Sequence, residues 1–239
     1  MKKTLCRIVY AALLGLVLGS APALAFAANE AGKMLATVGD VSATQPDGVA
    51  RALTAGAAVL SGDVIATGAG ASAQWRYLDG TLVSLPANSR LRIDEYLYPN
   101  PERGFFSLLK GGLRTLSGSI GHKRREDYRM TTPVATIGIR GTDYQLRLCQ
   151  DDCPLGSANG LYLSVFEGAI EAVNDSGEFI LQAGESAFIP DRQSSLQRKN
   201  ELPEQLFPSQ PWHGAGGGGG GAAATSSIPA TGAGGQGLP

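Results

Sequence analysis

Few side chains of this chain are spaced as a catalytic site would require. His122 and His213 are its only imidazoles, and it contains no G-x-S-x-G, H-E-x-x-H or phosphate-binding loop. The residues required for the usual nucleophile–base pairs and metal sites are therefore missing from the sequence. A pair of carboxylates could still act together, since Asp and Glu are scattered through many β-folds. The residue types and spacings predict a protein without enzymatic activity, cofactor or metal site.

The N-terminus has the pattern of a secretory signal peptide. Three basic residues among the first seven are followed by an apolar run over residues 8–18, and small residues precede Ala25. Residues 1–25 are predicted to be removed, with cleavage after Ala27 as the alternative. The apolar run is shorter than the ~20 residues of a membrane-spanning helix. We expect a periplasmic or secreted protein with no membrane span in the mature chain.

Removal of this segment would make the chain more acidic. The full chain has 20 Lys and Arg against 21 Asp and Glu. Three of the basic residues and none of the acidic ones lie before residue 26, which leaves 17 against 21 and a net charge of −4. Nucleic-acid-binding domains generally carry a basic excess. The charge balance therefore indicates no nucleic-acid partner.

Two cysteines remain in the mature chain, Cys149 and Cys153. In a reducing compartment this C-x3-C spacing could form half of a metal site, but the sequence has no second pair. In an oxidising compartment a local disulfide is the better interpretation. We expect a disulfide that would stabilise the fold by about 2 kcal/mol in the chain-entropy model. A redox role for the pair is the alternative.

Residues 34–190 have the pattern of one all-β domain. Stretches of four to eight strand-forming residues alternate with Gly, Asp and Asn turns, and no long run has a helical period. Short strands of this kind are typical of a sandwich, a roll or a solenoid-like arrangement. Separate strands are predicted for residues 161–166 and 169–173.

The clearest hairpin has Asp79-Gly80 at its tip. This dipeptide favours a two-residue type I′ turn, in which both central residues have positive φ. Such a turn would place Tyr77 opposite Leu82.

The composition changes after Leu202. Three prolines lead into a glycine-rich stretch and then into Ala, Ser and Gly up to the last residue. Such a segment buries too little apolar surface to offset its conformational entropy. Residues 203–239 are predicted to form a disordered Pro/Gly-rich tail.

Six short motifs follow one another in the order found in the FecR domain, which this chain resembles. They read G-D-x-I-x-T-G, D-G-T, N-S, T-P-x6-R-G-T, E-G and A-G-E, and they lie between Gly62 and Glu185. The signature residues are Gly62, Asp63, Asp79, Gly80, Thr132, Pro133, Arg140, Gly141, Thr142, Glu167 and Gly168. In the family, this domain is the periplasmic part of iron-citrate signalling regulators. The resemblance implies an all-β module that senses a signal or docks onto another protein.

Several signature residues also have a local physical role. Pro133 biases Thr132 toward an extended backbone, and Gly141 permits a backbone geometry that a Cβ would strain. Arg140 could hold the crossover between strands by donating to a carboxylate or to carbonyls. Its alternative role is contact with a ligand or partner. The basic string at residues 122–125 is expected to be a solvated loop, with binding of a negative partner or polyanionic glycan as the alternative.

The chain also departs from the family. The regulators have a cytoplasmic region that acts on a sigma factor and then a membrane span, whereas this chain starts with the predicted export signal. We therefore expect a non-catalytic envelope protein that senses, signals or scaffolds through contacts with an envelope or membrane protein. The alternative is a carbohydrate- or cell-wall-binding β module, in which Trp75, Tyr96 and Tyr98 would present exposed rings to a glycan.

Overall fold

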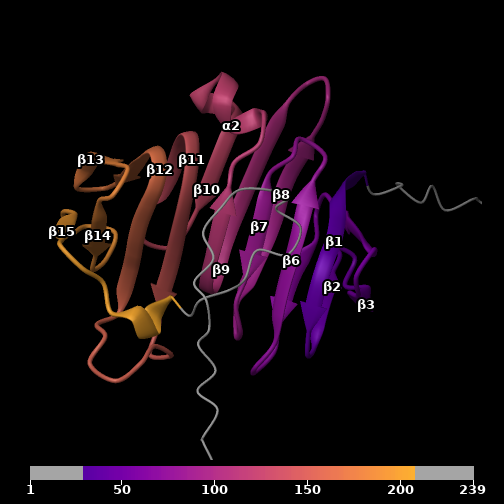
Figure 1. Cartoon of the computed structure of the whole chain (residues 1–239), viewed down its shortest axis with the longest axis horizontal. Helices are drawn as coiled ribbons and strands as arrows, with labels where there is room; N and C mark the ends of the chain where they lie inside the picture. The colour runs from indigo at the N-terminus through magenta and orange to yellow at the C-terminus, as the bar shows by residue number, and fades with distance from the viewer. Residues whose placement is uncertain (1–28, 208–239) are drawn as a thin grey trace, which may run out of the picture.

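The computed structural model describes residues 29–207, more than half of which lie in β-strands (Figure 1). The all-β prediction is confirmed. The predicted signal peptide and the part of the predicted tail beyond residue 207 lie outside the described residues. The elements are β1 (Glu30–Val38), β2 (Val41–Thr44), β3 (Ala50–Ala52), β4 (Ala58–Leu60), β5 (Val64–Thr67), β6 (Ser72–Tyr77), β7 (Leu82–Leu85), β8 (Arg90–Leu97), β9 (Arg103–Leu116), α2 (Ile120–Lys123), η1 (Arg125–Asp127), β10 (Tyr128–Thr131), β11 (Thr136–Cys149), β12 (Gly160–Asn174), β13 (Gly177–Gln182), β14 (Ser186–Ile189), β15 (Gln197–Lys199) and η2 (Glu204–Leu206).

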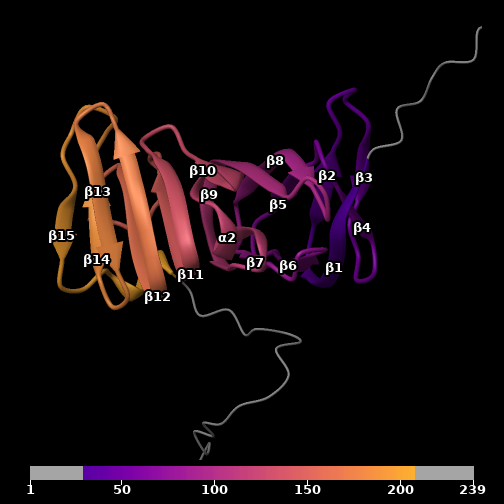
Figure 2. The ribbon, with the colours of Figure 1, turned by 90° about the horizontal axis from the view of Figure 1, so that it is seen from above.

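All fifteen strands are hydrogen-bonded into one sheet, which folds over into two layers. In layer A, β3, β2, β5, β8, β10 and β13 are joined through the first parts of β9 and β11 and the last part of β12. In layer B, β4, β1, β6, β7, β14 and β15 are joined through the remaining parts of the same three long strands. Figure 2 shows β5 and β8 on one side and β6 and β7 on the other.

The long strands pass from one layer to the other at glycines with positive φ. Gly111 in β9, Gly141 in β11 and Gly168 in β12 have φ values of 77°, 56° and 72°, which favour glycine. A Cβ at Gly168 would lie 2.2 Å from the carbonyl oxygen of Gly141. The prediction of separate strands for residues 161–166 and 169–173 is wrong, because β12 continues through a bend at Gly168.

The main hydrophobic core lies between the layers and contains a cluster of aromatic rings. Tyr77 stacks on Tyr96 with ring centroids 5.0 Å apart, and Phe106 joins Tyr77 to Tyr128. The Tyr128 and Tyr144 hydroxyls are 2.6 Å apart. Burial raises the pKa of Tyr77, Tyr96 and Tyr128 above the ordinary tyrosine value, and it raises the pKa of Tyr144 to about 12.

The predicted β6–β7 hairpin is present, but its predicted register is wrong. Trp75 pairs with Val83 and Arg76 with Leu82. The Tyr77 amide donates to Thr81 O and the Gly80 amide to Tyr77 O, so the loop has three residues. Only Gly80 of these loop residues has positive φ, as expected for a type I turn followed by a left-handed glycine.

The outward side of layer B carries a row of polar side chains that we call the polar ladder. Its members lie directly opposite one another on six neighbouring strands, so they share one face of the sheet. They are Gln74, Ser84, Arg114, Gln145, Ser164 and Ser186. Arg114 is paired with Asp143 through two hydrogen bonds of 3.0 and 2.7 Å. The ladder is therefore close to neutral.

Candidate functional site: the signature residues and an open trough

Asp63, from the first motif, is a buried structural anchor. Its side chain is fully buried and ion-paired with Arg51. One carboxylate oxygen also accepts from the Leu60 amide at 2.8 Å, and the other from the Gln45 side chain. These contacts satisfy a carboxylate that would otherwise be costly to bury.

Asp79 plays a similar role at the β6–β7 hairpin. Its carboxylate accepts from the hydroxyls of Thr81 (2.8 Å) and Tyr96 (3.1 Å) and from the Ile120 amide (3.3 Å). Thr81 in turn accepts from the Gly118 amide at 2.8 Å. The hairpin tip is thereby joined to β8 and to the loop that leads into α2.

The R-G-T and E-G motifs lie side by side where β11 and β12 bend. Thr142 is buried, and its hydroxyl donates to Ala169 O at 2.8 Å and accepts from the Arg140 amide at 3.1 Å. The Thr142 amide donates to the Ser117 hydroxyl at 2.8 Å. Thr142 therefore holds the crossover, a role that the sequence had suggested for the Arg140 side chain. Glu167 is exposed beside the bend.

The T-P motif closes the turn between β10 and β11. The Thr132 hydroxyl donates to Ala135 O at 2.8 Å and accepts from the Ala135 amide at 2.9 Å. Thr132 is buried and Pro133 is exposed. Within residues 29–207, no hydrogen bond or ion pair connects this turn to the junction of the R-G-T and E-G motifs. The same is true of Asp63.

Arg140 points to the outward side of layer A and lines a shallow depression that we call the trough. Its guanidinium is exposed and has no hydrogen-bond or ion-pair partner within residues 29–207. The trough has a volume of about 240 Å³. The trough is lined by residues of the three neighbouring strands β11, β12 and β13. They are Gly138, Ile139, Arg140, Ala169, Ile170, Glu171, Ile180 and Gln182, of which Ile139 and Ile170 are buried.

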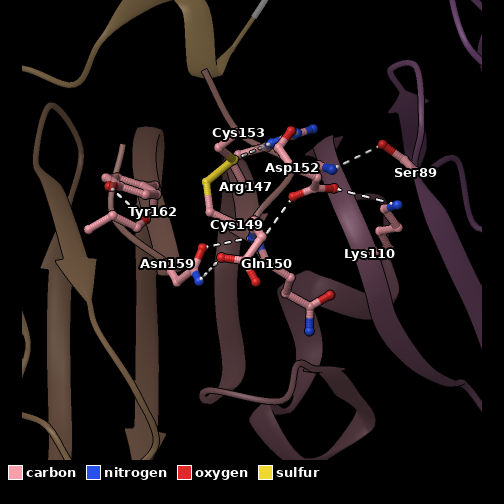
Figure 3. The surroundings of a disulfide bond; sticks show 12 residues. Ser89, Lys110, Arg147, Cys149, Gln150, Asp152, Cys153, Asn159 and Tyr162 are labelled. Atoms are coloured by element: carbon pink, nitrogen blue, oxygen red, sulfur yellow. Dashed lines mark hydrogen bonds and ion pairs between the residues drawn. A yellow bond between two sulfur atoms is a disulfide. The ribbon is translucent and has the colours of Figure 1, made fainter. Parts of the chain in front are cut away.

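The predicted disulfide between Cys149 and Cys153 is present, at one end of layer B (Figure 3). Arg147 donates to Cys153 Sγ at 3.2 Å and to Asp152 O at 3.3 Å. Lys110 of β9 lies 3.8 Å from the Asp152 carboxylate. These contacts join the disulfide loop to the neighbouring strands.

Residues 202–207, which we call the C-terminal arm, pack beside the disulfide. Leu206 is buried with Cys149, Tyr162 and Phe188 in a second hydrophobic cluster, against which Leu202 and Phe207 pack. The arm and the polar ladder enclose a groove of about 520 Å³. The packed structure therefore extends past the predicted domain end at residue 190 and into the first residues of the predicted tail.

Lys123 and Arg124 of the basic string are both paired with carboxylates. Lys123 lies 2.8 Å from Glu102, and Arg124 donates twice to Asp127, at 2.8 and 3.1 Å. The His122 ring nitrogen Nδ1 is 2.7 Å from Gly118 O. These pairs favour the solvated-loop interpretation over a site for a negative partner.

The aromatic residues on which the glycan hypothesis rested are mostly buried. Trp75 is 0% exposed and Tyr96 is 2% exposed, because both point into the core between the layers. Tyr98 is 36% exposed, but it lacks the two companions expected for a flat aromatic surface. The prediction of exposed rings at Trp75 and Tyr96 is wrong.

Comparison with known proteins identifies the domain. Residues 63–171 match the family model described as FecR protein. The chain carries a FecR domain. The match covers five of the six motifs in whole or in part, and it supports a signalling or regulatory role. The A-G-E motif lies beyond its end.

Two solved structures are also similar. Both are crystal structures of a "putative anti-sigma factor" from Parabacteroides distasonis ATCC 8503, at 1.65 and 2.50 Å resolution. They are 19% and 20% identical to this chain, with a TM-score of 0.45 in each case. The alignments cover 58% of this chain and 59% of each of those chains, so this chain spans about three fifths of their length. None of the curated proteins matches this chain.

Sequence reasoning missed three residues of the site. Arg51 neutralises Asp63, Ser117 bonds the crossover at Thr142, and Arg129 lies next to the trough. Arg129 had a usable signal, since in Tyr128-Arg129-Met130 a charged residue alternates with two apolar ones. The other two are brought to their partners only by the fold.

Proposed function

We propose that this protein is exported and is a non-catalytic FecR-domain protein that senses, relays or scaffolds a signal by binding another protein of the cell envelope. The FecR match supports the regulatory class, and the signal-peptide pattern of residues 1–25 supports export. Within residues 29–207, no helix is both long and apolar enough to cross a membrane. In the same residues, no three His, Cys, Asp or Glu side chains are grouped so that they could hold a metal ion.

The observation that carries the proposal is the contrast among the polar signature residues. Asp63, Asp79, Thr132 and Thr142 are buried and hydrogen-bonded inside the domain. Arg140 belongs to the same signature but presents its charge on an open face. A charged side chain with no partner in its own domain is suited to contact another molecule.

The proposal can be tested in cells by site-specific photocrosslinking combined with fractionation. A photoreactive residue at Ile180, which is 47% exposed in the trough, should give a discrete protein adduct in the envelope fraction. Leu78 is a matched control, because it is 49% exposed at the tip of the β6–β7 hairpin, away from the trough. A cytosolic location, or equal adducts from both positions, would contradict the proposal.

A further inference from the structure

The cations on the outward side of layer A are not evenly neutralised. Arg92 is paired with Asp94, and Arg103 lies 3.5 Å from Glu95. Arg129 and Arg140 have no carboxylate partner within residues 29–207. Met130 pairs with Ile137, which places Arg129 beside Gly138, and Arg140 is two residues further along the same face of β11. Two unpaired guanidinium groups therefore flank Gly138.

Arg129 is held in place without losing its donors. Its guanidinium lies 4.1 Å from the centroid of the Phe105 ring. Stacking on an aromatic face orients the planar group and leaves its N–H edge free to bond. A carboxylate that approaches Gly138 would meet Arg129 on one side and Arg140 on the other.

The floor of the trough is open to an extended chain. A Cβ added at Gly138 would meet only the Glu171 side chain, at 3.6 Å from its Oε2 atom. Ile180 and Ala169 form an apolar wall, since both lie on the same face of the sheet as Gly138. Glu171 is the carboxylate among the lining residues, and it lies directly opposite Gly138. Across this face the order is therefore Arg129, Gly138, Glu171 and Ile180, and Arg140 lies beside Ala169 one step further along β11.

We propose that the trough binds an extended acidic segment of the partner protein. Carboxylates of the segment would bond to Arg129 and Arg140, and an apolar side chain of the segment would lie against Ala169, which is directly opposite Arg140, and Ile180. Charge-assisted hydrogen bonds from arginine to carboxylate are among the stronger polar contacts in proteins. This inference rests on the proposed function and adds to it the chemistry of the partner.

The test uses the mature chain and two synthetic peptides. One is a capped octapeptide with Glu at alternate positions and a central Leu, and the other has Gln in place of each Glu. The Glu peptide should shift the amide NMR signals of Gly138, Arg140 and Glu171 to saturation. The Gln peptide should bind about tenfold more weakly, because its contacts lack charge assistance. Added salt should weaken only the Glu peptide.

Variants of the chain locate the interaction. Arg129→Gln and Arg140→Gln should each weaken Glu-peptide binding about three- to tenfold. Arg90→Gln is the matched control, because Arg90 is exposed on β8 of the same layer and also has no carboxylate partner within residues 29–207. Its affinity should equal that of the unmodified chain.

Three results would overturn the inference: equal binding of both peptides, binding that Arg140→Gln leaves unchanged, or an equal loss in Arg90→Gln. If the Glu peptide does not bind while Ile180 still crosslinks a protein in cells, the acidic segment is wrong and the proposed function stands. If Ile180 also gives no adduct, the proposed function is contradicted as well.

Discussion

On the outward side of layer A, Arg129 and Arg140 flank an open trough, whereas the polar ladder on the outward side of layer B is close to neutral and lies beside the C-terminal arm. β11 and β12 contribute residues to both of these faces. The bends at Gly141 and Gly168 decide which residues of these strands serve which face. A continuous strand can therefore carry exposed charged side chains at one end and packed side chains at the other.

The largest effect is expected where the two layers are joined. Gly168→Ala should cost more than about 3 kcal/mol of unfolding free energy, because the new Cβ would lie 2.2 Å from Gly141 O at a positive φ. Gly184→Ala is the control: its φ is 83° but a Cβ there meets nothing within 4 Å, so only about 1–2 kcal/mol of backbone strain is expected. Urea denaturation measures both, and equal losses would contradict the role of Gly168.

Alkaline pH should unfold both layers together, because the buried tyrosines lie between them. Their pKa values are raised in the folded state, to about 12 for Tyr144, against 10 when unfolded. The folded state therefore holds these protons more tightly. Stability should be constant below about pH 10 and should fall as the pH rises toward 12, by about 1.4 kcal/mol per pH unit for each tyrosine.

Denaturation curves measured at several pH values, together with the ultraviolet absorbance of tyrosinate, would check this. Ionisation of the buried Tyr77, Tyr96, Tyr128 and Tyr144 should occur together with unfolding, whereas Tyr98 is 36% exposed and is not part of this test. Ionisation of these four buried tyrosines at pH 10 in a chain that stays folded would show that their rings are accessible and would contradict the packed core.

Loss of the disulfide should affect the layer B face alone. The double substitution of Cys149 and Cys153 by Ser should cost about 2 kcal/mol, as expected for closing a short loop. It should also speed hydrogen exchange at Leu206, because the arm packs beside the disulfide. The control is the unmodified chain with a thiol reductant, which should behave like the double variant. Equal acceleration at Gly138 would show that the faces are not independent.

The smallest stability effect is expected in the trough. Arg140→Gln should change the unfolding free energy by no more than about 0.5 kcal/mol, because the side chain is exposed and has no ion-pair partner within residues 29–207. Arg129→Gln should cost at most about 1 kcal/mol, because it also loses the stacking on Phe105. Asp63→Asn should instead cost about 3 kcal/mol, since it breaks a buried pair with Arg51. Thermal unfolding distinguishes the two classes, and a large loss in Arg140→Gln would give that residue a structural role.

Local chemistry predicted some parts of this structure well. The disulfide followed from the cysteine spacing and the predicted export, and a turn was expected at Asp79-Gly80. The β6–β7 register was missed because Asp-Gly also fits a three-residue loop, in which only the glycine has positive φ. Such a one-residue difference changes every cross-strand pair.

Other parts depend on contacts between distant residues. Gly168 was interpreted as the end of a strand, because nothing nearby shows that the chain continues past the bend in the same ladder. The exposure of Arg140 could not be predicted either, since the bulge after it interrupts the strand alternation. Burial of Leu206 depends on Tyr162 and Phe188, which lie far away in the sequence.

The central claim is that the protein signals through the trough of its FecR domain, and gene expression in cells tests it most directly. Transcript levels would be compared in cells that lack the protein, in cells with Arg129→Gln and Arg140→Gln combined, and in cells with Arg90→Gln, at equal protein abundance. The combined variant should reproduce the expression changes of the deletion, and Arg90→Gln should leave expression unchanged. A combined variant that matches the unmodified chain, while the deletion alters expression, would contradict the claim.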